Sequence, residues 1–167
     1  MQDRVTPPVS VLFVGINPGI RSALLGHHFA GFSNRFWKLL FDAGIVPEPI
    51  SFRDDDRLHE WQLGITNLIA RPTPGIDTLR PVEYVEGLKI LRRKVRRWKP
   101  EVVAFVGVTV FRAAFACGAK APVKLGLQRE RFEGARVVVL PNPSGRNANF
   151  TYAEMLAAFR SLRRFVC

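Results

Sequence analysis

A five-residue turn, Gly15-Ile16-Asn17-Pro18-Gly19, follows a β-rich apolar run and exposes an amide side chain to a possible ligand. Two glycines and a proline make such a turn rigid and leave its backbone accessible. The Asn17 amide cannot take up a proton as a carboxylate can, but its oxygen can orient a water molecule. The alternative is a structural turn in which Asn17 bonds its own backbone. The turn therefore offers either a water-positioning group or a purely structural one.

A second stiff polar loop, residues 141–147, reads Pro-Asn-Pro-Ser-Gly-Arg-Asn and follows another apolar run. Its small residues allow a close approach of another backbone, and the Ser144 hydroxyl can donate a hydrogen bond to a phosphate. The alternative is an ordinary strand-to-helix connection. The phosphate-binding patterns GxGxxG and GxxxxGK followed by Ser or Thr are absent from the sequence. No nucleotide cofactor is therefore predicted.

Both loops follow strands in a pattern that alternates β and α. Apolar runs predict buried strands at residues 9–15, 64–70, 102–108 and 136–140. Apolar spacing and capping residues predict helices at residues 35–43, 54–62, 81–99, 109–117 and 151–165.

This order of elements predicts one α/β domain over residues 1–167, with a central four-stranded, mainly parallel sheet and helices on both faces. Residues 1–8 are expected to be flexible. In open α/β sheets the ligand crevice lies beyond the carboxyl ends of the strands. Both polar loops belong to that edge.

The charge balance indicates a polyanionic partner. Lys and Arg number 25 against 14 Asp and Glu, a formal net charge of +11, and 19 of the cations are arginine. Arginine suits phosphate because its planar guanidinium donates several hydrogen bonds at once. The alternative is a protein that is merely basic.

The composition excludes several other classes. Hydrophobic residues make up 47% and charged residues 23% of the chain, which argues against a disordered tail. The first eight residues contain no apolar signal-peptide core, and no apolar run approaches the length of a membrane span. Cys117 and Cys167 cannot hold a four-cysteine iron–sulfur cluster and fit a reducing compartment, so the expected location is the cytoplasm.

Taken together, the two loops resemble those of the mismatch-specific uracil/thymine-DNA glycosylase family, within the uracil-DNA glycosylase superfamily. The resemblance spans about residues 9–160, nearly the whole chain. Further segments that match in order and spacing are Phe29, Asn34-Arg35-Phe36-Trp37, Gly64-Ile65-Thr66-Asn67 and Arg71-Pro72-Thr73-Pro74-Gly75.

The resemblance implies a monofunctional glycosylase that removes uracil from mismatches with guanine, with thymine and other damaged pyrimidines as further candidate bases. Asn17 matches the catalytic asparagine that positions the attacking water, and Phe29 matches the aromatic that stacks on the flipped base. Ser22 and Asn67 match positions that line the base pocket. The loop that grips phosphate and fills the vacated helix matches Asn142, Pro143, Ser144, Gly145 and Arg146.

Physical reasons support these roles. A base within a duplex must be flipped out before it can react, and stacking on an aromatic ring offsets part of the cost. If the glycosidic bond largely breaks before attack, a weak nucleophile suffices, and an oriented water can serve. Backbone N–H groups near Ile16 and Phe29 could stabilise the base as it leaves as an anion.

Four positions depart from other branches of the superfamily. More active uracil glycosylases carry aspartate where this chain has Asn17 and histidine where it has Asn142, so slow chemistry is predicted. Bacterial relatives often carry lysine at the position of Asn67 and leucine at that of Arg146. At these two positions, Asn67 and Arg146 are more similar to the residues of the eukaryotic thymine-DNA glycosylase branch.

A site built on Asn17 lacks a carboxylate, and the residues themselves suggest Asp77 as a further candidate catalytic group. It is the single acid between Glu60 and Glu83, and the Thr-Pro-Gly turn before it could fold it back toward the crevice. The resemblance does not mark this position. The alternative is that Asp77 caps the next helix or pairs with Arg80.

Other polar groups carry weaker signals. His27 and His28 are expected to be exposed loop residues, and the Asp54-Asp55-Asp56 run a solvated helix start. No cluster has metal-ligand spacing, so neither a metal nor another cofactor is predicted. The basic helix face of Arg92, Arg93, Lys94, Arg96 and Arg97 either follows a DNA backbone or is the solvated side of the helix.

The sequence thus predicts an enzyme that starts base-excision repair, acting as a monomer on double-stranded DNA and not at a membrane. The alternative function is a catalytically weak or silent module that binds mismatched or abasic DNA. Retention of Asn17, Phe29 and the intact Asn-Pro-Ser-Gly loop favours the enzyme.

Overall fold

One sheet organises the chain. The computed structural model describes residues 1–115, 117 and 121–166, so Cys167 and the part of the predicted 109–117 helix at residue 116 lie outside the described residues. The strands are β1 (Val11–Gly15), β2 (Leu63–Asn67), β3 (Val102–Val106), β4 (Gly126–Phe132) and β5 (Ala135–Leu140). Their order across the sheet is β2-β1-β3-β5-β4. Strands β1, β2, β3 and β5 are parallel to one another, which confirms the predicted parallel core.

The prediction of four strands was wrong, because β4 adds a fifth, antiparallel strand at one edge. Its sequence Gly-Leu-Gln-Arg-Glu-Arg-Phe is mostly polar and largely exposed, so it lacks the apolar run of a buried strand. Glu133 and Gly134, both with positive φ, turn the chain directly from β4 into β5. Two consecutive residues with positive φ are typical of a tight β-hairpin turn. This turn is the local feature that indicates the additional strand.

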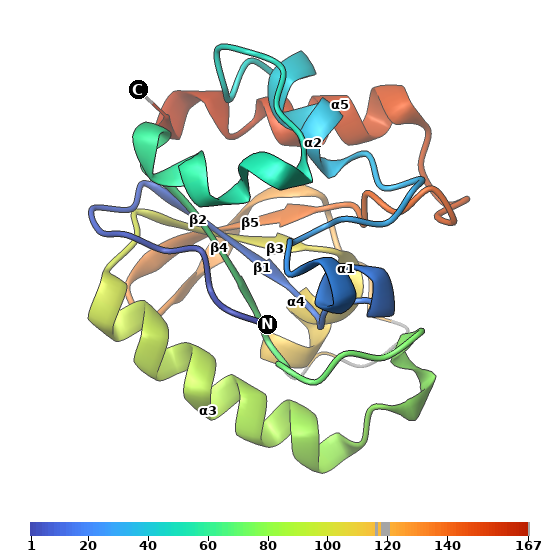
Figure 1. Cartoon of the computed structure of the whole chain (residues 1–167). Coiled ribbons are helices and arrows are strands. Elements are labelled where there is room, and N and C mark those ends of the chain that lie inside the picture. Colours follow the sequence, from blue (N-terminus) through green and yellow to red (C-terminus); the bar gives the residue numbers. More distant parts are fainter. Residues whose placement is uncertain (116, 118–120, 167) are drawn as a thin grey trace.

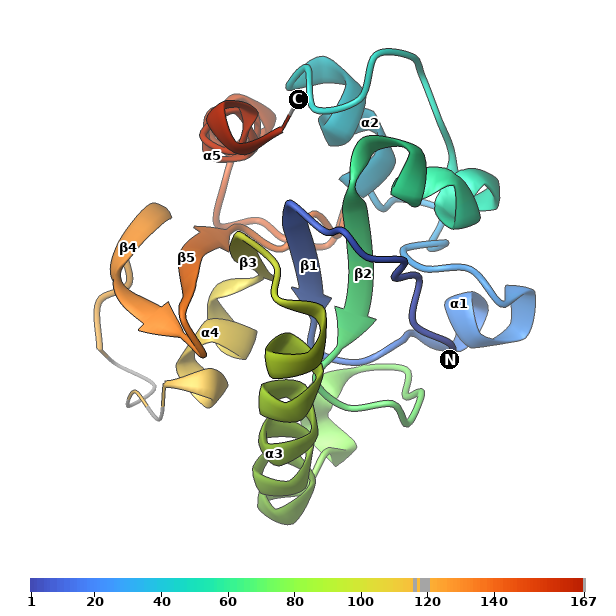
Figure 2. The same cartoon turned by 90° about the vertical axis from the view of Figure 1, so that its left-hand side faces the viewer.

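Helices cover both faces of the sheet, as predicted (Figures 1 and 2). On one face, α2 (Phe36–Asp42) and α5 (Tyr152–Arg160) pack on alternate strand residues such as Phe13 and Ile65. On the other face, α3 (Pro81–Trp98) and α4 (Val108–Ala114) pack on the intervening residues such as Leu12 and Phe105. Both sets of strand side chains are fully buried, which explains the unbroken apolar runs.

Some helix boundaries differ from those predicted. A short helix α1 (Ile20–Leu25) follows the first turn and was not predicted. The segment expected as a helix at 54–62 is a 3-10 helix, Phe52–Trp61, capped by Ser51. The final helix is divided into α5 and a 3-10 turn, Arg163–Phe165, while α4 ends at Ala114. Further 3-10 residues, Ile76–Thr78, precede α3.

Residues 1–8, for which the sequence suggests flexibility, include several with defined contacts. Arg4 forms an isolated antiparallel bridge with Ile65 of β2. The Asp3 carboxylate accepts a hydrogen bond from the Thr66 hydroxyl at 2.5 Å and pairs with the Lys94 ammonium at 2.8 Å. These contacts hold the start of the chain along the exposed edge of β2.

Gly87 of α3 is packed too closely to accept a side chain. A Cβ atom there would lie 2.3 Å from the backbone oxygen of Leu68. Helix propensity favours Gly87→Ala by about 1 kcal/mol, whereas the overlap with backbone is expected to cost about 1–3 kcal/mol.

We therefore expect Gly87→Ala to lower the free energy of unfolding, measured by urea denaturation. Arg93→Ala on the exposed face of the same helix is the control, with an expected change within about 0.5 kcal/mol. A Gly87→Ala protein more stable than the parent would show that α3 does not pack on Leu68 in this way.

Candidate active site

A cavity of about 540 Å³ opens where β1, β2 and β5 end, at the predicted edge of the sheet. Its size falls within the usual range for small-molecule sites. Eight predicted site residues line it: Ile16, Asn17, Ser22, Phe29, Asn67, Asn142, Ser144 and Arg146. Pro143 and Gly145 belong to the same loop but are not among the lining residues.

The Asn17 amide has a fixed orientation. Its Nδ2 donates to the backbone oxygen of Arg71 at 3.0 Å and to the Thr73 hydroxyl at 2.7 Å. Because a carbonyl oxygen can only accept, the NH₂ group must face Arg71. The Asn17 carbonyl oxygen is then the polar atom that remains for the cavity.

Thr73 holds this arrangement and is itself almost completely buried. Its backbone N–H donates to the Pro18 oxygen at 3.2 Å, and its hydroxyl donates to the Gly75 oxygen. The loop after β2 therefore positions the turn after β1. In the sequence Thr73 belongs to a segment that matches the family, but nothing in the sequence indicates this role.

The Phe29 ring provides one flat wall of the cavity. It stacks on Phe36 with ring centroids 4.2 Å apart and an interplanar angle of 24°. Phe36 is completely buried, whereas Phe29 is half-buried and lines the cavity. One face of Phe29 thus rests on the core and the other is available for a planar ligand.

The backbone at Phe29 is in the left-handed region, with φ at +51°, which is unfavourable for a bulky residue. Hydrogen bonds on both sides hold it there. The His28 N–H donates to the Asp55 carboxylate at 2.9 Å, and the Ala30 N–H donates to the Ser22 hydroxyl at 3.0 Å. The Trp37 indole donates to the His28 oxygen at 3.2 Å.

Asp55 and His28 differ from their predicted environments. Asp55 is completely buried, not part of a solvated helix start, and it also pairs with His27 at 2.9 Å and with Arg4 at 3.2 Å. His28 is 3% exposed and lines the cavity. These contacts join segments far apart in the chain, so local sequence carried no signal for them.

His28 connects this network to Asn67. His28 Nε2 lies 2.7 Å from the backbone oxygen of Gln2, so Nε2 carries the proton and Nδ1 is an acceptor. The Asn67 Nδ2 donates to that Nδ1 over 3.5 Å. The Asn67 oxygen faces Gly15, where a Cβ atom would lie only 2.7 Å from it. Gly15 must therefore be glycine for Asn67 to reach this position.

The loop after β5 closes the opposite side of the cavity. The Asn142 carboxamide accepts from the Ser144 N–H at 3.0 Å, and the Ser144 hydroxyl accepts from the Arg146 N–H at 3.2 Å. Gly145 packs on Ser33 so closely that a Cβ would lie 2.4 Å from the Ser33 Cβ. This loop therefore has a fixed shape, with the Arg146 side chain exposed at its tip.

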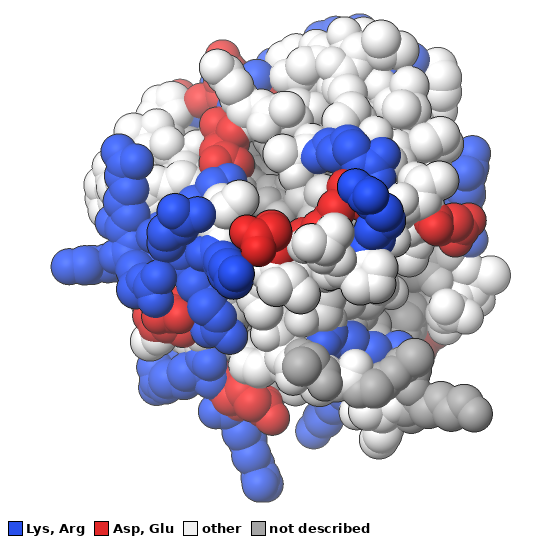
Figure 3. Space-filling model, turned by 90° about the horizontal axis from the view of Figure 1, so that it is seen from below, with Lys and Arg blue, Asp and Glu red and all other residues white. Residues whose placement is uncertain are grey.

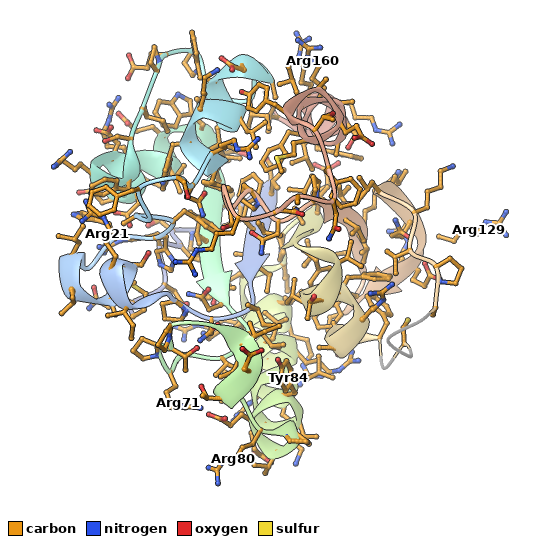
Figure 4. All side chains as sticks on the ribbon, turned by 90° about the vertical axis from the view of Figure 1, so that its right-hand side faces the viewer. Arg21, Arg71, Arg80, Tyr84, Arg129 and Arg160 are labelled. Atoms are coloured by element: carbon orange, nitrogen blue, oxygen red, sulfur yellow. The ribbon has the colours of Figure 1, made fainter. Side chains whose placement is uncertain are left out.

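The structure does not bring Asp77 to the cavity. Asp77 lies on the exposed 3-10 turn Ile76–Thr78 and is not a lining residue. Its neighbourhood is organised instead by Arg71, which pairs with Glu83 at 2.7 Å and lowers the pKa of that half-buried carboxyl to about 2. Figure 4 shows Arg71, Arg80 and Tyr84 gathered near the start of α3.

The basic face of α3 also lies away from the cavity. The C-terminal half of the helix is next to the start of β3, at the opposite end of the sheet, and Figure 3 shows the resulting group of cationic side chains. Arg92 and Arg96 pair with Glu133 at 3.1 and 3.4 Å.

Among residues 1–115, 117 and 121–166, no three His, Cys, Asp or Glu side chains come together as a metal site. Over the same residues, none of the helices has the length and apolar character required to cross a membrane.

The fold and cavity define an α/β protein with a polar site at the carboxyl ends of its strands. The chain matches the family model of the Uracil DNA glycosylase superfamily over residues 3–163, and it belongs to that superfamily. It is 40% identical over 147 residues to a G/U mismatch-specific uracil DNA glycosylase of Schizosaccharomyces pombe. That match covers 84% of this chain and 45% of the relative.

The fold is similar to the solution NMR structure of a protein from Methanosarcina acetivorans, with a TM-score of 0.62. The two sequences are 16% identical, and the match covers 96% of this chain and 95% of that one. This similarity supports the fold.

Burial lowers the pKa of His28 below its usual value of 6.5, although the hydrogen bond to Gln2 opposes this shift. In the unfolded chain His28 takes up a proton as the pH falls through about 6.5, before it does so in the native state. We therefore expect the contribution of neutral His28 to the free energy of unfolding to be fully present above that pH and to decrease below it.

Urea denaturation at about pH 7.5 and about pH 5.5 measures this loss. His28→Gln, whose amide can still donate to Gln2, is expected to lose less stability over the interval than the parent. Equal losses in the two proteins would contradict a neutral, buried His28.

Proposed function

We propose that this protein is a monofunctional DNA glycosylase that excises uracil from G·U mismatches and so starts base-excision repair. Thymine and other damaged pyrimidines opposite guanine are the further candidate bases. The supporting observation is the pairing in one cavity of a fixed Asn17 amide with a half-buried Phe29 ring. A G·U pair is easier to open than a matched pair, so part of the mismatch preference comes from the DNA.

Phe29 is the proposed surface for the flipped base. Its free face offers base stacking worth about 1–3 kcal/mol, which offsets part of the cost of flipping. Asn67, held by His28, is positioned beside it to hydrogen-bond the edge of a pyrimidine. Because His28 Nδ1 accepts from one Asn67 N–H, the amide has a defined orientation toward the base.

Asn17 is the proposed water-positioning residue. As the bond between sugar C1′ and the base nitrogen breaks, the base leaves with the electron pair and the sugar becomes cationic. A water held by the Asn17 oxygen then bonds C1′ and releases a proton. Among the described residues that line the cavity there is no Asp or Glu, so slow chemistry is expected.

The loop after β5 is the proposed grip on the DNA. Ser144 and the loop backbone can bond phosphate, and Arg146 can enter the space left by the flipped base. The formal net charge of +11 favours this encounter.

We further propose that the protein acts as a monomer in the cytoplasm. One chain supplies the residues that line the cavity, and two cysteines among 167 residues fit a reducing compartment. The name of the Schizosaccharomyces pombe relative supports the G·U substrate.

Asn17→Ala is expected to slow uracil excision from a G·U duplex by about 10²–10³-fold, the usual effect of losing one well-placed polar catalytic group. Binding to the same duplex should change little, because the loop after β5 is intact. Single-turnover cleavage after alkali treatment measures excision, and fluorescence anisotropy measures binding.

Thr73→Val is the matched control, since it removes one acceptor of the Asn17 amide but leaves the bond to Arg71. Its expected loss is smaller than that of Asn17→Ala. Full activity of Asn17→Ala would assign the water to another residue.

Arg146→Ala tests the filling of the vacated base stack. It should slow excision from a G·U duplex much more than excision from an unpaired uracil, where there is no stack to fill. Arg53→Ala, an exposed arginine outside the cavity, is the control for charge alone. Equal losses on both substrates would reduce Arg146 to a phosphate contact.

A further inference from the structure

The aromatic side chain of Phe32 is exposed to solvent. Its exposed fraction is 89%, the largest among the exposed hydrophobic residues of the described chain, and yet it lines the cavity. Most surface phenylalanines cover part of a core, and Phe32 covers none. The core of the protein therefore does not account for its place at the rim.

Arg21 of α1 holds the Phe32 ring. The guanidinium carbon lies 3.6 Å from the ring centroid, which is a close cation–π contact. Arg21 Nε donates to the backbone oxygen of Ala30 at 2.8 Å, so the guanidinium is itself anchored. Both residues line the cavity, and Figure 4 shows Arg21 beside α1.

The loop that carries Phe32 is also fixed. The Asn34 N–H donates to the Gly31 oxygen at 3.1 Å, and Gly145 packs on Ser33 from the other side. The Arg35 N–H donates to the Pro143 oxygen at 2.9 Å. The backbone on either side of Phe32 is therefore fixed, and its ring has Arg21 on one face and solvent on the other.

Two aromatic rings thus serve the same cavity at different depths. Phe29 rests on the buried Phe36, whereas Phe32 stands at the rim. If the inner ring receives a flipped base, the exposed outer ring at the rim is available to the nucleotide beside it. A stacking surface flanked by a cation is typical of sites that hold unpaired nucleic acid.

We propose that Phe32 and Arg21 form a stacking platform for the base next to the flipped nucleotide, and that this platform makes uracil in single-stranded DNA a substrate. The proposal rests on the proposed glycosylase function. In a duplex the neighbouring base is already ordered by its own pair and stack. In a single strand that order must come from the protein, so the platform contributes most there.

The experiment uses a single-stranded oligonucleotide with one uracil flanked by 2-aminopurine, on the 5′ side in one probe and on the 3′ side in another. Stacking on an aromatic ring quenches 2-aminopurine fluorescence. The parent should quench one of the two probes. Phe32→Ala should lose that quenching, and Phe32→Trp should retain it.

Single-turnover excision provides the second readout. Phe32→Ala should slow excision from the single strand roughly fivefold to hundredfold, the range for loss of one stacked base, and slow excision from a G·U duplex by clearly less. Phe32→Trp should restore the single-strand rate. Leu24→Ala is the matched control, because Leu24 is 81% exposed but does not line the cavity.

Unchanged quenching with Phe32→Ala would overturn the platform. Equal slowing on single strand and duplex would also overturn it, since a general binding role would then suffice. Failure of the parent to excise uracil from a G·U duplex would count against the proposed function instead. In that case the quenching of the two probes still decides whether the platform exists.

Discussion

The site depends on the contacts made by the buried carboxylate of Asp55. It accepts the His28 N–H and pairs with His27 and Arg4, so it ties the loop before α2 to the start of the chain. A buried charge is tolerated only when it is paired and hydrogen-bonded, and these three contacts meet that need. The left-handed backbone at Phe29 is held in consequence, and the ring stacks on Phe36. Together with the Ala30–Ser22 and Trp37–His28 hydrogen bonds, this anchor holds the flat wall of the cavity in place.

The polar groups of the cavity are largely committed to one another. Asn17 donates to Arg71 and Thr73, Asn67 donates to His28, and Ser22 accepts from Ala30. These hydrogen bonds fix the orientation of each amide and leave few donors and acceptors for a ligand. The proposed reaction would therefore rely on positioning and on the departure of the base as an anion, because no carboxylate is among the described residues that line the cavity.

Sequence alone predicted the parallel core, the helices on both faces and the gathering of two polar loops at one edge, because buried parallel strands have unbroken apolar sequences. It missed β4, whose residues are polar because they form an exposed edge. Eight of the eleven candidate site residues line the cavity, yet the burial of Asp55 and His28 was not predicted. Those two residues meet 27 positions apart and contact the chain terminus, so their environment is a tertiary property. Asp77, a candidate suggested by the turn before it, does not reach the cavity, because that turn does not fold the chain back toward it.

We propose that the cavity containing Asn17 and Phe29 breaks an N-glycosidic bond. The most direct measurement is single-turnover incubation of the unaltered protein with end-labelled 30-base-pair duplexes, roughly three helical turns, that contain G·U, A·U or G·C at one position. Alkali then cleaves each strand that has lost a base. We expect cleavage at the uracil of G·U, less at A·U and none at G·C. Tight binding to the G·U duplex without cleavage would contradict the proposal and would identify a DNA-binding module instead.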